Sequence, residues 1–169
     1  EAESESWANN ATGVFCEALI PRHPQMPLPL SGRLAVLRWM GNNAERPALR
    51  CVAIKAIEEA VDPGNMMQLR SVPGPVPADS APPLMWEQVW EYLDALVGLL
   101  MGLAEGKDLE AVIPARDVLP RVLFHYVAQV PPEKALPKLS TTLEWVLIPE
   151  MGLSPSAFAD TLRSALDLY

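Results

Sequence analysis

The sequence has few of the residues that carry out chemistry in enzymes. It contains two cysteines and two histidines in 169 residues. Cys16 and Cys51 stand 35 positions apart and His23 and His125 stand 102 apart, whereas metal-binding motifs place ligands a few residues apart. The family signatures that surround a catalytic cysteine are also missing. We therefore predict no catalytic residue, no metal and no cofactor, and keep a cysteine-dependent enzyme only as a third hypothesis.

Positive charge is scarce as well. Thirteen lysine and arginine residues stand against 21 acidic ones, which gives a formal net charge of −8, and no basic cluster occurs. Because nucleic acids and anionic membrane surfaces attract positive charge, we expect neither as a partner. Residues 84–169 hold 12 of the acidic residues and 6 of the basic ones. The predicted surface is therefore more acidic in the second half of the chain.

Long apolar runs are missing from the sequence. The longest, at residues 95–104, is about half of the roughly 20 residues that a membrane-spanning helix needs. Both cysteines fall beside core-facing positions of predicted helices, which favours reduced thiols and a cytoplasmic protein. The chain opens on Glu1, so a complete protein and a piece of a longer one both stay open.

Proline, by contrast, is abundant, with 18 residues, about twice its ordinary usage. Most prolines fall where a helical apolar pattern begins or ends, so they separate helices. No alternating strand pattern is bounded by hairpin turns. The sequence therefore predicts one all-α domain over residues 1–169. Its seven helices are expected at residues 3–19, 31–41, 47–61, 84–105, 116–130, 133–148 and 154–168, with a proline-rich crossing loop at residues 62–83.

The helix predicted at residues 84–105 organises the rest of the chain. Its first half is amphipathic, with Trp86 and Trp90 turned inward and polar residues, Glu91 and Asp94 among them, on the opposite, solvent face. Its second half is apolar or glycine all round. Such a helix is expected in the middle of a helical domain. Gly98 and Gly102, four residues apart, would let a second helix approach closely. We interpret the pair as core packing, with a self-association face as the alternative, so homo-oligomerisation stays open.

Aromatic side chains supply two further candidate sites. Trp39 and Trp145 lie off the apolar stripes of their helices, so one of them is expected to line a contact surface. The other candidate is an apolar pocket between two helices, lined by Trp86, Trp90, Met101 and Tyr126.

The order of proline-started helices resembles HEAT-like α-solenoid repeats. The pairs would be residues 34–40 with 48–61, 84–105 with 116–130, and 133–148 with 154–168. The opening third is similar to helical segments that follow the NTPase core in bacterial STAND-type signalling proteins; the likeness rests on Trp7, Val14-Phe15, the proline connector at residues 21–29 and Leu30-Ser31-Gly32-Arg33-Leu34. That resemblance implies a sensor or scaffold region whose nucleotide motifs lie elsewhere in a parent chain.

The leading functional hypothesis is a non-catalytic helical interaction or scaffold module. It would bind a protein or peptide through a surface rimmed by acidic side chains. The alternative is a small-ligand sensor that uses the tryptophan- and methionine-lined pocket.

Overall fold

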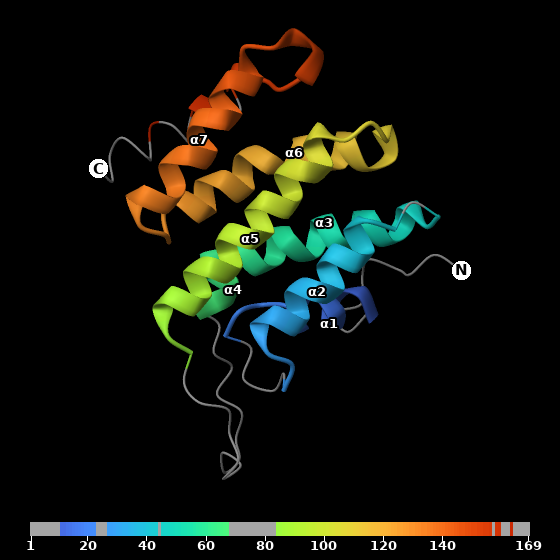
Figure 1. Cartoon of the computed structure of the whole chain (residues 1–169), viewed down its shortest axis with the longest axis vertical. Helices are drawn as coiled ribbons and strands as arrows, with labels where there is room; N and C mark the ends of the chain where they lie inside the picture. The colour runs from blue at the N-terminus through green and yellow to red at the C-terminus, as the bar shows by residue number, and fades with distance from the viewer. Residues whose placement is uncertain are drawn as a thin grey trace.

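The computed structural model describes residues 11–22, 27–43, 45–67, 84–156, 158–159 and 163. Within these ranges the chain forms seven α-helices, one 3-10 helix and no strand (Figure 1). The helices pack in contacting pairs, so the predicted all-α fold with seven helices is confirmed. They are α1 (Ala11–Ala18), α2 (Leu30–Gly41), α3 (Pro47–Val61), α4 (Pro63–Met67), α5 (Trp86–Glu105), α6 (Leu109–Val127) and α7 (Pro132–Val146), followed by η1 (Pro149–Met151).

Helix α5 crosses the middle of the molecule, with α2 and α3 on one side and α6 and α7 on the other (Figure 1). It buries one long face, as its apolar spacing predicts. The buried side chains of that face are Val89, Tyr92, Leu93, Leu96, Val97, Leu100, Met101 and Ala104. Helix α3 meets this core with small side chains at Ala53, Ala56 and Ala60. The role of α5 as the central packing helix is therefore confirmed.

Helix α6 is longer than its sequence suggests. It runs unbroken from Leu109 through Pro114 and Pro120, whereas the prediction began the helix at residue 116. The difference arises because Asp108 caps the helix, its Oδ1 accepting from the Glu110 amide at 3.1 Å. Pro114 removes the N–H that would bond to the Glu110 carbonyl, and the Cys51 thiol lies 3.8 Å from that oxygen.

Other predicted boundaries change less. The short helix α4 occupies part of the stretch expected to be a loop, where the Asp62 side chain accepts from the Gly64 amide at 2.8 Å. Helix α2 begins at Leu30, one residue before the start expected at residue 31, so Ser31 lies inside its first turn. Residues 3–10, 68–83 and most of 154–168 lie outside the described residues. The division of the chain by a crossing loop at residues 62–83 thus stays a prediction.

Arg33 is a charged residue inside the fold, only 3% exposed on α2. Its Nε donates to the Leu28 carbonyl at 2.9 Å. Its Nη1 donates to the Ile20 carbonyl and lies 3.4 Å from the Pro21 carbonyl. Burial lowers the pKa of this guanidinium, and the charge of Tyr92 acts in the opposite direction. Arg33 therefore ties α2 to the segments that follow α1 and precede α2.

Candidate functional site

One face of α5 is open to solvent along most of the helix. Its exposed residues are spaced three, four or seven positions apart, as on a single helix face: Glu87, Glu91, Gly98, Gly102 and Glu105. A Cβ added at Gly98 or Gly102 would have no heavy atom of the described residues within 4 Å. The interpretation of this pair as core packing is therefore wrong, because α2, α3 and α6 cover the other faces of α5. We call these five residues the open face.

The open face is bordered on both sides. Toward α2, Leu99 and Leu103 of α5 pack against Gly41, with Leu99 Cδ1 3.4 Å from a Cβ placed there. Toward α7, Asp94 binds Lys138. Asp94 lies one turn before Gly98, so the two residues are neighbours on the helix surface. The open face is thus a strip of α5 between two helices, with its glycines in the C-terminal half.

The open face consists of acidic side chains and of glycines, which have no side chain. Its three glutamates are exposed, and the neighbouring carboxylate Asp94 is already paired with Lys138. Glycine lets the backbone of a second helix come close, because no side chain holds it away. The combination suits a partner helix that carries positive charge and lies close to the backbone of α5.

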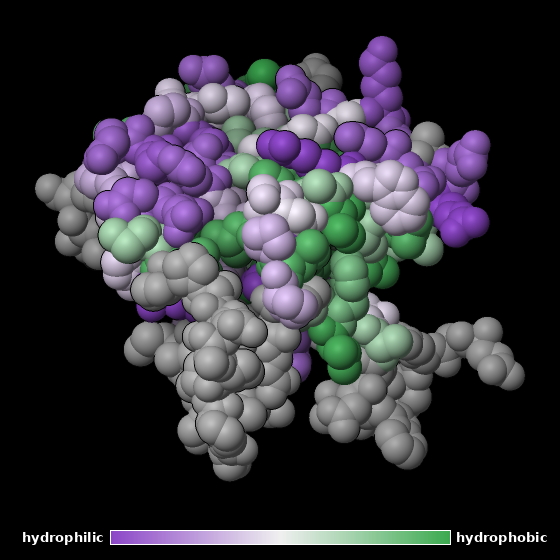
Figure 2. All heavy atoms as spheres, turned by 60° about the horizontal axis from the view of Figure 1, so that its bottom comes forward, coloured by the Kyte–Doolittle hydropathy of each residue, from purple (hydrophilic) through white to green (hydrophobic). Residues whose placement is uncertain are grey.

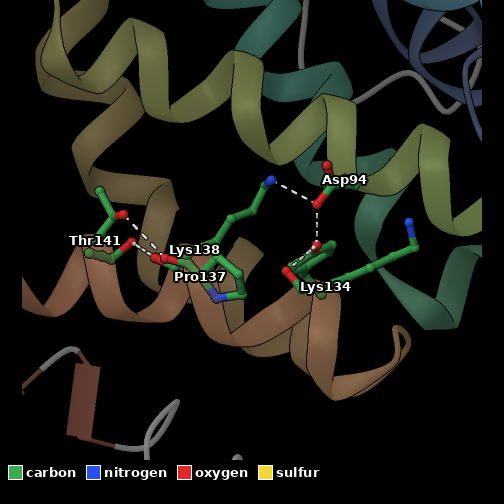
Figure 3. A network of polar contacts seen from close by, with 7 residues as sticks. Asp94, Lys134, Pro137, Lys138 and Thr141 are labelled. Carbon is green, nitrogen blue, oxygen red and sulfur yellow. Dashed lines mark hydrogen bonds and ion pairs between the residues drawn. The ribbon is translucent and has the colours of Figure 1, made fainter.

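Asp94, Tyr126 and Lys138 form a polar clasp that joins α5, α6 and α7. Figure 3 shows Lys138 pointing toward Asp94. The Tyr126 hydroxyl donates to Asp94 Oδ1 at 2.5 Å and lies 3.2 Å from the Lys134 carbonyl oxygen. Lys138 Nζ lies 2.7 Å from the same Oδ1. Desolvation acts to raise the pKa of Asp94, but the hydrogen bonds from Lys138 and Tyr126 and the charges of Lys138 and Lys134 outweigh it and lower the pKa. The sequence placed Asp94 on the solvent face and missed this role.

The clasp predicts a pH-dependent loss of stability. Asp94→Asn should lower the free energy of unfolding by about 2 kcal/mol at neutral pH, because a charged hydrogen-bonded group is removed. Since the folded-state pKa is below the unfolded value of about 3.9, the contribution is fully present above that value and is lost as pH falls through the folded pKa. Urea denaturation of both proteins between pH 7 and pH 3 should therefore show the difference shrinking below about pH 4. Glu91→Gln, an exposed change one turn earlier, is the control and should show no such trend.

The predicted contact tryptophans lie in different settings. Trp39 is 60% exposed on α2, which fits a surface residue. Trp145 is partly buried against the core. Trp86, expected to point inward, is 50% exposed because it is the first residue of α5 and no earlier turn covers it. Its ring lies 6.4 Å from that of Trp90, and the Arg22 guanidinium lies 3.8 Å from the Trp86 ring centre.

The four residues of the expected apolar pocket do not meet. Met101 is 15 residues after Trp86 on the same helix, which corresponds to about 22 Å along its axis. Tyr126 is fully buried and its hydroxyl binds Asp94, between those two ends. A ligand-sensing role would therefore have to rest on the Trp86–Trp90 pair alone.

Apolar side chains also gather at the end of the molecule that holds α1, α4 and the start of α5. Figure 2 turns this end forward and shows them in the middle of the face, below a hydrophilic region. The exposed large apolar residues of these elements are Val14, Leu84, Met85 and Trp86. No charge pattern accompanies them that would identify a partner, and we assign this surface no role.

The two cysteines differ in their access to solvent. Cys16 is buried, and desolvation, helped by the charge of Glu59, raises its pKa to about 11. Cys51 is exposed on α3. Because the thiolate is the reactive form, we expect a thiol reagent such as DTNB to label Cys51 rapidly and Cys16 only on unfolding. Cys51→Ser should remove the fast phase, and a fast reaction that survives it would show that the segment around Cys16 opens readily.

The described residues hold no group of three His, Cys, Asp or Glu side chains placed to bind a metal ion. Among the described helices, none combines the length and apolar character needed to cross a membrane. Comparison of the chain with protein-family models, curated proteins and solved structures finds no match.

Proposed function

We propose that this protein is a non-catalytic helical interaction module that binds a partner helix on the open face of α5. The observation that carries the proposal is the pair Gly98 and Gly102, exposed in the C-terminal half of α5 with open space above them. Glycine in the interior of a helix costs roughly 0.5–1 kcal/mol relative to alanine. Neither glycine gives internal packing in return, which supports a role in close contact with another molecule.

Charge indicates the kind of partner. The open face has glutamates at both ends, Glu87 and Glu91 before the glycines and Glu105 after them, and the whole chain carries a net charge of −8. A second copy of this chain would bring like charge to this face, whereas a basic amphipathic helix would meet opposite charge. The proposed partner is therefore a basic helical segment of another protein.

The finer architecture that we propose is HEAT-like. The contacts of α2 with α3 and of α5 with α6 are consistent with two successive helix pairs. Solenoids of this kind are built as scaffolds and bind partners along exposed helices. A scaffold role therefore agrees with the open face, although it does not identify the partner.

A peptide-display selection tests the proposal. The immobilised wild-type chain would be presented with a library of helical peptides, after depletion on the double variant Gly98→Leu/Gly102→Leu. We expect enriched peptides to be basic and helical, and their binding to weaken with added salt because the contact is partly electrostatic. Enrichment of no peptide, or of peptides that bind both proteins equally, would contradict the proposal.

A further inference from the structure

Helix α7 is attached to the rest of the molecule less deeply than its neighbours. Only Ala135, Leu139 and Thr142 are buried among its described side chains, against eight side chains on α5 and nine on α6. The Thr142 hydroxyl donates to the Lys138 carbonyl of its own helix at 2.8 Å, so it anchors nothing else. Since local stability follows buried apolar contact, α7 should be the easiest of the three helices to release.

The chain on either side of α7 is anchored in the core. Val130 is buried just before the pair Pro131 and Pro132, and Leu153 is buried just after Gly152. Gly152 has a φ of 62°, a left-handed conformation that marks a sharp change of chain direction. Residues 131–152 therefore form an arm between two fixed points, and Figure 1 shows it projecting from one end of the molecule.

Polar contacts supply much of the hold on this arm. Asp94 of α5 receives both Lys138 of the arm and the Tyr126 hydroxyl of α6 through one oxygen. Farther along, Arg116 Nη2 lies 3.4 Å from Met151 Sδ, while its Nε donates to the Ala104 carbonyl at 2.8 Å. Asp94 thus links the arm to α5 and α6, and Arg116 contacts the arm a second time near its end.

We propose that residues 131–152 open as a unit while α1–α6 stay folded, and that Asp94 holds the arm closed. Opening separates Lys138 from Asp94 and brings Ala135 and Leu139 into solvent. The chain turns at Pro131–Pro132 and at Gly152, between the anchors Val130 and Leu153. This motion does not depend on the interaction proposed for the open face and can be tested without a partner.

Hydrogen exchange on the native full chain tests the arm. In the wild type, amides of residues 135–146 should exchange faster than those of α3 and α5, through an opening that does not unfold the other helices. Asp94→Asn should accelerate the α7 amides by roughly tenfold, because the charged contacts are lost, and the α7 amides should still exchange faster than those of α3. Lys138→Met should act in the same direction, and Glu91→Gln should change neither helix.

Two results would overturn the proposal. In the first, α7 amides are as strongly protected as those of α5 in the wild type, so that they exchange only with global unfolding. In the second, neither Asp94→Asn nor Lys138→Met changes the exchange of the α7 amides. The first result would show that the arm does not open separately, and the second that the clasp does not hold it closed.

Discussion

Arg33→Met is expected to lower the free energy of unfolding by about 3 kcal/mol, even though methionine fits an apolar interior well. The guanidinium binds the carbonyl oxygens of Ile20 and Leu28 inside the fold. A buried acceptor that loses its donor costs roughly 1–3 kcal/mol, and more than one acceptor is affected. Urea denaturation followed by tryptophan fluorescence would measure the loss.

The matched control is Arg38→Met, which removes an exposed arginine from the same helix. A surface change of this kind should shift the free energy of unfolding by no more than about 0.5 kcal/mol. Equal effects of the two substitutions would mean that the carbonyls near Arg33 find other donors. In that case α2 would not depend on its buried charge.

The double variant Gly98→Leu/Gly102→Leu should weaken binding of a selected basic helical peptide by about 100-fold, because leucine side chains fill the space that a partner backbone would use. Its stability should not fall, since both positions face open space. Gly98→Ala and Gly102→Ala should each raise the free energy of unfolding by about 0.5–1 kcal/mol. Fluorescence anisotropy and urea denaturation together separate the two effects.

Lys55→Leu on α3 is the control for added apolar surface, because Lys55 is exposed on a different helix. It should leave peptide binding unchanged. If the glycine variant bound the peptide as tightly as the wild type, the open face would not be the docking surface. If Gly98→Leu/Gly102→Leu and Lys55→Leu both bound the peptide more tightly than the wild type, the contact would be a nonspecific hydrophobic interaction.

The sequence predicts the fold best where the helical spacing of apolar residues agrees with the prolines and glycines that begin and end helices. Helices α3 and α5 begin and end close to the predicted residues, because Pro47 starts the first of them and Gly106 follows the second. The predicted helix begins at residue 116, later than α6 does, because a proline such as Pro114 ordinarily ends or interrupts a helix. The Asp108 cap and its ion pair with Arg50, a residue 58 positions earlier, stabilise the first turns of that helix. A contact of that range leaves no local signal.

The candidate site was predictable in part. The four-residue spacing of Gly98 and Gly102 predicts that the two glycines share one face of the helix, but an apolar run of residues does not tell which side other helices cover. For Asp94 the sequence predicts exposure where the structure shows a contact. Helical spacing places it on the solvent face together with Glu91, and only the position of α7 shows that it binds Lys138. Because Asp94 follows Glu87 by seven residues and Glu91 by three, it lies on the same helix face as they do, and the sequence has no signal that separates it from them.

The contact between Gly41 and the two leucines of α5 has a further consequence. There, a glycine on one helix receives Leu99 and Leu103, four residues apart, from another. On the open face the glycines belong to α5, so an incoming helix would contribute the large side chains, as α5 does in its contact with α2. Such a helix should therefore carry two large apolar side chains four positions apart on the side that meets Gly98 and Gly102, with basic residues on its flanks. The contact between α2 and α5 thus shows the shape that the proposed partner helix should have.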